Sequence, residues 1–151
     1  MASIQRILLP VDFSAPSIAA MHYGLDLARS LGAKATLLHV YGLPNYVLPD
    51  GTALLANAEA IVKITEAADR ELKGLIADAE KHEDKVPLDT KLVEGDPARE
   101  IIRIAGDEKY DLVVMGTHGR GFLERVLLGS VAERVVRKAP CPVLTLRAPH
   151  E

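Results

Sequence analysis

The sequence predicts an α/β protein in which a parallel sheet carries helices on both faces. Short apolar runs alternate along the whole chain with segments whose apolar residues recur every three or four positions. The run LVVM at 112–115 is apolar at every position, which is typical of a strand covered on both faces. In chain order, five strands alternate with four helices, and strands joined in this way lie parallel with right-handed crossovers.

The amino-terminal segments are predicted to be two strands joined by a helix. The strands occupy residues 4–11 (IQRILLPV) and 35–41 (ATLLHVY). Between them Ile18 and Met21 begin the apolar stripe of an amphipathic helix, and Gly32 provides its C-terminal stop.

The middle of the chain is predicted to hold a loop, a long helix and an edge strand. Residues 42–51 are rich in glycine, proline, asparagine and aspartate, which favours a loop. The apolar stripe from 55 to 79 predicts the longest helix, and residues 88–93 alternate apolar with polar side chains, as an edge strand does. Asp96 and Pro97 suit the N-cap and first position of the next helix.

The carboxyl-terminal part completes the alternation. The strand at 112–115 is followed by a glycine-rich stretch, a helix from about 131 to 138, and a last strand at 143–146. We expect residues 1–151 to form a single domain, because 151 residues suit one domain of ordinary size.

Composition excludes several classes of function. The 18 lysine and arginine residues against 21 aspartate and glutamate residues give a net charge of −3, which offers no long-range attraction for nucleic acid or anionic lipid. Cys141 is the only cysteine, which rules out an intramolecular disulfide and argues against a Cys/His zinc site. The sequence has neither a signal-peptide layout nor an apolar run of membrane-spanning length. We therefore expect a cytoplasmic protein that binds neither nucleic acid nor membrane.

Ligand-binding residues are expected at the carboxyl ends of the strands. Open sheets of this type bind ligands there, at the point where the strand order reverses. Three strand ends qualify, namely residues 10–12 (PVD), 39–41 (HVY) and 115–119 (MGTHG).

A glycine-rich stretch after the fourth predicted strand is the strongest functional signal. Gly116, Gly119 and Gly129 lie between that strand and a helix that begins near Ser130. Glycines let the backbone approach a phosphate, and free amides at a helix N-terminus hold an anion without a lysine. Two plainer explanations stay open: the glycines form turns, and Ser130 with Glu133 forms a capping box. The stretch is not a Walker A loop, because Gly-Lys-Ser/Thr occurs nowhere in the chain.

The spacing of these glycines resembles a motif of one family. Gly116, Gly119, Gly129 and Ser130 follow the pattern G-2x-G-9x-G-(S/T) of the ATP-binding branch of the universal stress proteins. Further segments resemble family signatures in the same order, namely ILLPVDFS, LLHV, GDPARE, DLVVMGTHGRG and GSVAERVVRKAPCPVLTLR. The resemblance covers nearly the whole chain and is least diagnostic at 42–51 and in the long helix.

The resemblance implies a fold, a ligand and an assembly. The fold would be a Rossmann-like three-layer α/β/α sandwich with five parallel strands in the order 3-2-1-4-5. The ligand would be ATP, with Mg²⁺ or Mn²⁺ held mainly through the phosphates. The assembly would be a homodimer that pairs antiparallel through the last strand, residues 143–146.

The resemblance, together with the positions of the strand ends, also implies a set of nucleotide-binding residues. Asp12 would lie beside the adenine or ribose, and Val40 would offer backbone groups to the adenine edge. Gly129, Ser130 and Val131 would present amides and a hydroxyl to the phosphates. The complete expected site is Pro10, Val11, Asp12, Val40, Met115, Gly116, His118, Gly119, Arg120, Gly129, Ser130 and Val131.

Several of these side chains also have plainer explanations. Asp12 is placed to cap the first helix or turn, a role for which Ser14 competes. Arg120 is a loop cation able to reach a phosphate, although an exposed arginine often has no specific partner. His39 is expected in the core or at an interface, and Cys141 as a small buried residue at the start of the last strand.

Three functions fit this sequence. No nucleophile, base and orienting group can be identified together, so we favour an ATP-binding stress-response or regulatory protein whose dimer or partner contacts respond to the nucleotide. The alternatives are a slow ATP-hydrolysing enzyme on the same fold and a nucleotide-independent dimeric scaffold or chaperone-like protein.

Overall fold

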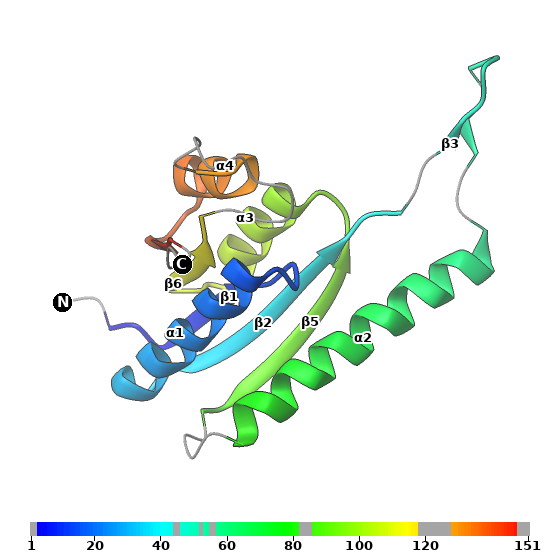
Figure 1. Ribbon diagram of the computed structural model, residues 1–151. Coiled ribbons are helices and arrows are strands. Elements are labelled where there is room, and N and C mark those ends of the chain that lie inside the picture. Colours follow the sequence, from blue (N-terminus) through cyan, green and yellow to red (C-terminus); the bar gives the residue numbers. More distant parts are fainter. Residues whose placement is uncertain are drawn as a thin grey trace.

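A five-stranded parallel sheet organises the protein (Figure 1). The computed structural model describes residues 3–43, 46–51, 53–54, 57–81, 86–117 and 128–147. The strands of the sheet are, in chain order, β1 (Arg6–Pro10), β2 (Lys34–Tyr41), β5 (Leu88–Glu94), β6 (Leu112–Gly116) and β7 (Val143–Leu146). Their spatial order is β5-β2-β1-β6-β7 and every neighbouring pair is parallel. Counted within this sheet alone, that is the predicted order 3-2-1-4-5, and the predicted fold class is confirmed.

Four helices connect these strands, and their ends follow the capping residues of the sequence. The helices are α1 (Ala15–Leu31), α2 (Ala58–Lys81), α3 (Pro97–Asp107) and α4 (Ser130–Lys138). Gly32 ends α1 in the left-handed conformation, with φ 65°, as predicted. The Asp96 side chain accepts the Arg99 amide at 2.9 Å, so the predicted N-cap of α3 is confirmed.

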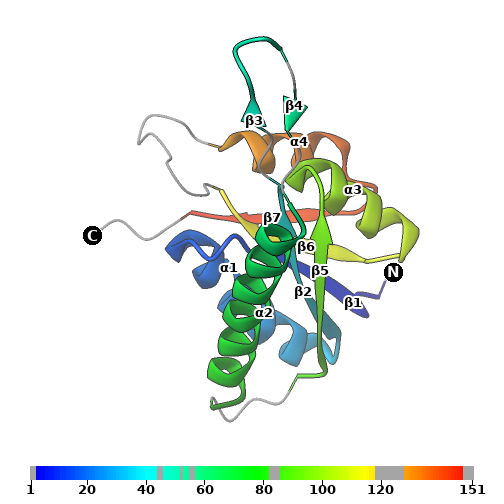
Figure 2. The same cartoon turned by 90° about the vertical axis from the view of Figure 1, so that its right-hand side faces the viewer.

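Side chains of the sheet alternate between two apolar layers. Leu9, Leu37 and Val114 point to the face covered by α1 and α2. Leu8 and Val113 point to the face covered by α3 and α4. Figure 2 shows the two pairs of helices on opposite sides of the sheet. All five residues of β6 are buried, because this strand lies between β1 and β7 with helices on both faces.

The segment between β2 and α2 contains a hairpin where the sequence predicts only a loop. Strands β3 (Tyr46–Val47) and β4 (Ala53–Leu54) pair antiparallel, and the Gly51 amide donates to the Leu48 carbonyl at 2.8 Å to close the turn. Gly51 has φ 85°, a conformation that glycine adopts at little cost. In Figure 1 the hairpin extends away from the sheet beyond the carboxyl end of β2.

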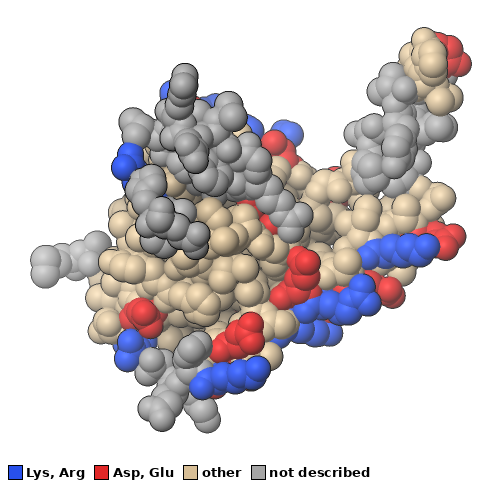
Figure 3. Space-filling model, in the orientation of Figure 1, with Lys and Arg blue, Asp and Glu red and all other residues tan. Residues whose placement is uncertain are grey.

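The outer face of α2 carries charges of both signs. Lys63 pairs with Glu59 at 3.3 Å and Lys73 with Asp69 at 2.7 Å, each one helical turn apart. Figure 3 shows basic (blue) and acidic (red) side chains interspersed along this side of the molecule. Within the ranges that the structure describes, no helix combines the length and the apolar character needed to cross a membrane.

Candidate functional site

The ends of the glycine-rich stretch meet at the carboxyl end of β6. The Gly129 amide donates to the Thr117 carbonyl at 2.6 Å, and the Thr117 amide donates to the Leu146 carbonyl of β7 at 2.9 Å. Gly116 ends β6 and Ser130 begins α4, so this backbone contact brings the first and last glycines of the motif to one place. The chain continues from β1 to β2 on one side of the sheet and from β6 to β7 on the other. The adjacent ends of β1 and β6 are therefore the point where the strand order reverses, the switch point.

Gly116 has a packing reason to be glycine. A Cβ atom built at Gly116 would lie 3.1 Å from the carbonyl carbon and oxygen of Pro16 and 3.4 Å from the Ser17 nitrogen. These atoms are backbone in the first turn of α1, and they cannot rotate away as a side-chain end can. The first glycine of the motif therefore lets α1 approach β6, whether or not a ligand binds beside it.

The explanation of Ser130 and Glu133 as a capping box, left open by the sequence, is wrong. Gly129 is the N-cap, with φ −69° and ψ 166°, and Ser130 is already the first helical residue. A serine one position inside the helix no longer has the extended backbone from which a capping hydroxyl reaches the amide three residues on. The Glu133 carboxylate instead accepts from Arg137 at 2.7 Å. Ser130 is exposed, and its hydroxyl is not the N-cap of this helix.

At the end of β1, Ser14 caps the helix and Asp12 closes the turn before it. The Ser14 hydroxyl accepts the Ser17 amide at 3.3 Å, which makes Ser14 the N-cap of α1. The Asp12 carboxylate accepts the Ser14 amide at 2.9 Å and also the Ser14 hydroxyl. Between them Phe13 has φ 65°, a left-handed conformation that is unusual for an aromatic residue. The competition between Asp12 and Ser14 for the cap is thus decided for Ser14.

His39 lies at this edge of the sheet, within the predicted strand end 39–41, but sequence reasoning missed its contacts with Val11 and Phe13. Its Nδ1 lies 2.8 Å from the Val11 carbonyl oxygen, and its ring centroid lies 4.4 Å from that of Phe13. The pairing register of β1 and β2 explains this placement. Pro10 of β1 is opposite Leu38 of β2, so the next residue of each strand is also a neighbour of the other.

The other expected residues are distributed over neighbouring strand ends. Pro10 ends β1, Val40 lies one residue before the end of β2, and Met115 is buried one residue before the end of β6. Val40 and Val131 are half-buried against the α3/α4 layer. His118, Gly119 and Arg120 lie outside the residues that the structure describes.

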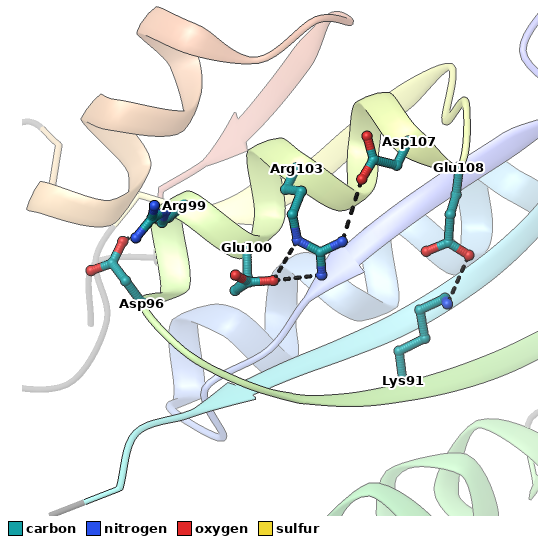
Figure 4. A network of polar contacts seen from close by, with 7 residues as sticks. All are labelled: Lys91, Asp96, Arg99, Glu100, Arg103, Asp107 and Glu108. Carbon is teal, nitrogen blue, oxygen red and sulfur yellow. Dashed lines mark hydrogen bonds and ion pairs between the residues drawn. The ribbon is translucent and has the colours of Figure 1, made fainter.

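Ion pairs lie on the exposed side of α3 and at its contact with α4. Arg134 of α4 donates to the Asp96 carboxylate at 3.1 Å, which joins the start of α3 to α4. On α3, Arg103 donates to Glu100 at 2.6 Å and to Asp107 at 3.4 Å (Figure 4). The hydrogen bond with Glu100 raises the pKa of Arg103. The Arg103 pairs lie within α3, so Arg134–Asp96 is the one of these contacts that joins α3 to α4.

A separate hollow lies at the opposite edge of the sheet. It measures about 500 Å³, and Arg6, Thr36, Asp89 and Tyr110 are among its lining residues. The Tyr110 hydroxyl donates to the Thr36 hydroxyl at 2.9 Å, and the Arg6 guanidinium lies 4.6 Å from the centroid of the Tyr110 ring. None of the residues expected to bind a ligand lines this hollow.

Metal-binding and thiol chemistry have little support among the described side chains. In the described ranges there is no group of three or more His, Cys, Asp or Glu residues that could hold a metal ion. Cys141 is partly buried before β7, and burial, followed by the charge of Asp111, raises the pKa of its thiol. A raised pKa leaves less thiolate at neutral pH, which is the opposite of an activated cysteine.

Comparison with known proteins places this chain in one family. The family model described as the universal stress protein family matches residues 3–147. The universal stress protein MJ0531 of Methanocaldococcus jannaschii is 37% identical over 148 residues, which are 97% of this chain and 84% of that protein. Among solved structures, universal stress protein UspA from Lactobacillus plantarum superposes with a TM-score of 0.81 at 27% identity, over 97% of this chain and 100% of that one.

A more distant neighbour was solved with a nucleotide. It is a universal stress protein family protein from Arabidopsis thaliana with AMP bound, 21% identical, with a TM-score of 0.64 over 96% of this chain and 92% of that one. At this identity the likeness is one of fold. The family model and the archaeal relative together carry the assignment: this chain belongs to the universal stress protein family.

Proposed function

We propose that this chain binds ATP at the switch point between β1 and β6, and that the bound nucleotide alters its dimer or partner contacts. One observation carries the proposal. The glycines at the two ends of the G-2x-G-9x-G-S spacing, far apart in sequence, are drawn together by the hydrogen bond from Gly129 to Thr117. This places the start of α4 beside the carboxyl end of a central strand, where open sheets bind their ligands.

The start of α4 suits a phosphate group. The first amides of a helix have no acceptor within the helix, and its dipole adds partial positive charge there. Gly129 occupies the N-cap without a side chain to fill that position, and the exposed Ser130 hydroxyl is available in addition. Amides of Ser130 and Val131 would then bind phosphate oxygens, while Mg²⁺ or Mn²⁺ would neutralise phosphate charge.

The adenosine part would lie toward β1 and β2. Asp12 follows β1 and is held in a defined orientation by Ser14, so its carboxylate is a candidate partner for ribose or adenine. Val40 is near the end of the neighbouring strand β2, where backbone groups would meet the adenine edge. A relative of the same fold with AMP bound supports an adenine nucleotide as the class of ligand.

The proposed homodimer would form along β7. Among the described residues this strand lies at the edge of the sheet and pairs with β6 alone, so its outer side is open to a further strand there. Antiparallel pairing of β7 with the same strand of a second copy would give a symmetric, closed contact. Because Leu146 of β7 accepts the Thr117 amide and Thr117 accepts the Gly129 amide, the dimer edge and the start of α4 share one hydrogen-bond path.

The release of bound nucleotide from purified protein tests the proposal. The protein is denatured by heat, the precipitate is removed, and the supernatant is resolved by ion-exchange chromatography. The variant Gly129→Glu puts a carboxylate where the phosphates should lie, and its backbone conformation suits a side chain. Gly74→Glu is the matched control, because Gly74 is exposed in α2 with no atom within 4 Å of a built Cβ.

Adenine nucleotide from the wild type and from Gly74→Glu, but not from Gly129→Glu, would support the proposal. Adding Mg-ATP to all three proteins covers the case of a site emptied during purification. A wild type that neither releases nor takes up nucleotide would favour the nucleotide-independent scaffold, and repeated turnover of added ATP would favour the slow enzyme.

A further inference from the structure

We infer that His39 is a positioning residue for the nucleotide: it holds both sides of the turn that carries Asp12. The inference rests on the proposed function, because the nucleotide is what Asp12 would meet. His39 itself has no assigned contact with the ligand, and it acts through the backbone of Val11 and the ring of Phe13.

The first contact is with the Val11 carbonyl, which lies just beyond the end of β1. The Val11 amide still donates to Leu38 at 2.8 Å, but β1 ends at Pro10 and Val11 is 4% exposed. Its carbonyl oxygen is met by His39 Nδ1 at 2.8 Å. A carbonyl only accepts, so Nδ1 carries the hydrogen and the tautomer of the neutral ring is fixed. A buried carbonyl that loses its donor is costly, which makes this hydrogen bond important for the local conformation.

The second contact supports a strained residue. Phe13 has φ 65°, and its ring lies 4.4 Å from the His39 ring with 41° between the planes. The Phe13 side chain also packs against the α1/α2 core layer. Such a conformation persists only where the surroundings fix it. His39 thus touches the residue before Asp12 and the residue after it.

The two contacts complement those that the serines make with Asp12. Ser14 donates to the Asp12 carboxylate, and the Asp12 amide donates to the Ser17 hydroxyl at 3.2 Å. The serines come from the start of α1, whereas His39 comes from β2. The turn is therefore clamped between a helix and a neighbouring strand, and removing His39 would release one side of the clamp.

Three variants separate the hydrogen bond from the bulk of the ring. In His39→Asn the side-chain amide nitrogen takes the place of Nδ1 and can still donate to Val11. In His39→Gln the amide nitrogen takes the place of Nε2 and cannot make that bond from the same backbone position. His39→Leu keeps apolar bulk and removes both ring nitrogens, so it can neither donate nor accept a hydrogen bond. Each is titrated with Mg-ATP by calorimetry, and its unfolding is followed without ligand.

We expect His39→Asn to bind close to the wild-type affinity, and His39→Gln and His39→Leu to bind about tenfold more weakly. If His39 merely filled space, the Asn variant would not bind Mg-ATP more tightly than the Gln and Leu variants. Equal affinities for the Asn and Gln variants would overturn the inference even if the Leu variant does not fold. A nitrogen NMR spectrum showing the hydrogen of neutral His39 on Nε2 would overturn it as well.

The wild type separates this inference from the proposed function. If wild type binds Mg-ATP and all folded variants bind equally well, His39 has no positioning role while the proposed function stands. If wild type does not bind, the proposed function fails and this inference fails with it.

Discussion

Replacing Gly116 by alanine tests the close packing of α1 against the end of β6. The new Cβ would lie 3.1 Å from backbone atoms of Pro16, closer than relaxed packing allows, so α1 or β6 must shift. Forcing a methyl group into a close-packed site costs about 1–3 kcal/mol. Replacing glycine by alanine also lowers the conformational entropy of the unfolded chain, which stabilises the folded protein by about 0.4–1 kcal/mol. The difference between these two effects is a net loss of between about 0 and 2.6 kcal/mol. Its midpoint, about 1.3 kcal/mol, would lower Tm by about 3–5 °C for a chain of this size.

Gly74→Ala is the matched control for this experiment. Gly74 lies within α2, and nothing is found within 4 Å of a Cβ built there. The same chemical change should therefore stabilise the protein by about 0.4–1 kcal/mol. Both variants are stripped of nucleotide and unfolded in urea, because a bound ligand would mask the difference. Gly116→Ala with a midpoint equal to or above that of Gly74→Ala would refute the packing argument.

Three further predictions concern Ser130, β7 and Cys141. Ser130→Ala should leave the free energy of unfolding within about 0.5 kcal/mol of the wild-type value, because the N-cap is Gly129. The same variant should bind Mg-ATP more weakly than wild type, and an equal affinity would remove Ser130 from the site. Thr145→Pro should turn a dimer into a folded monomer in sedimentation velocity. The Pro142 and Leu146 carbonyls accept the Val113 and Thr117 amides of the β6 side, so by alternation the backbone groups of Thr145 point to the outer edge of β7. An unchanged dimer would contradict pairing through β7. Burial raises the pKa of the Cys141 thiol, so at pH 8 the folded protein should react with iodoacetamide more slowly than the protein unfolded in urea. The alkylation rate of the folded protein should still rise as the pH is increased. Rapid alkylation of the folded protein would contradict the raised pKa.

Much of the fold could be predicted because the local signals agree with the tertiary structure. The wholly apolar run at 112–115 became the buried central strand β6, and the alternating segment at 88–93 became the edge strand β5. Asp96 capped α3 and Gly32 ended α1, since the short-range hydrogen bonds that they make are properties of the local sequence. The sheet order came from the family resemblance, because strand pairing depends on contacts between distant segments.

The site was less predictable, because its details depend on offsets of one residue and on contacts across the sheet. Ser130 has the S-x-x-E spacing of a capping box, but the helix begins one residue earlier than that box requires. Gly116 suggests a ligand loop, and only the approach of α1 reveals its packing role. His39 alternates with apolar neighbours like a core residue, and the pairing of Pro10 with Leu38 is needed to bring it to Val11.

Calorimetric titration of nucleotide-free protein with Mg-ATP shows whether ATP binds at the start of α4. We expect about one nucleotide per chain for the wild type and for Gly74→Glu, and severely weakened binding for Gly129→Glu with its fold intact by circular dichroism. Equal binding by Gly129→Glu would move the site away from α4. No binding by the wild type would contradict the proposed function altogether.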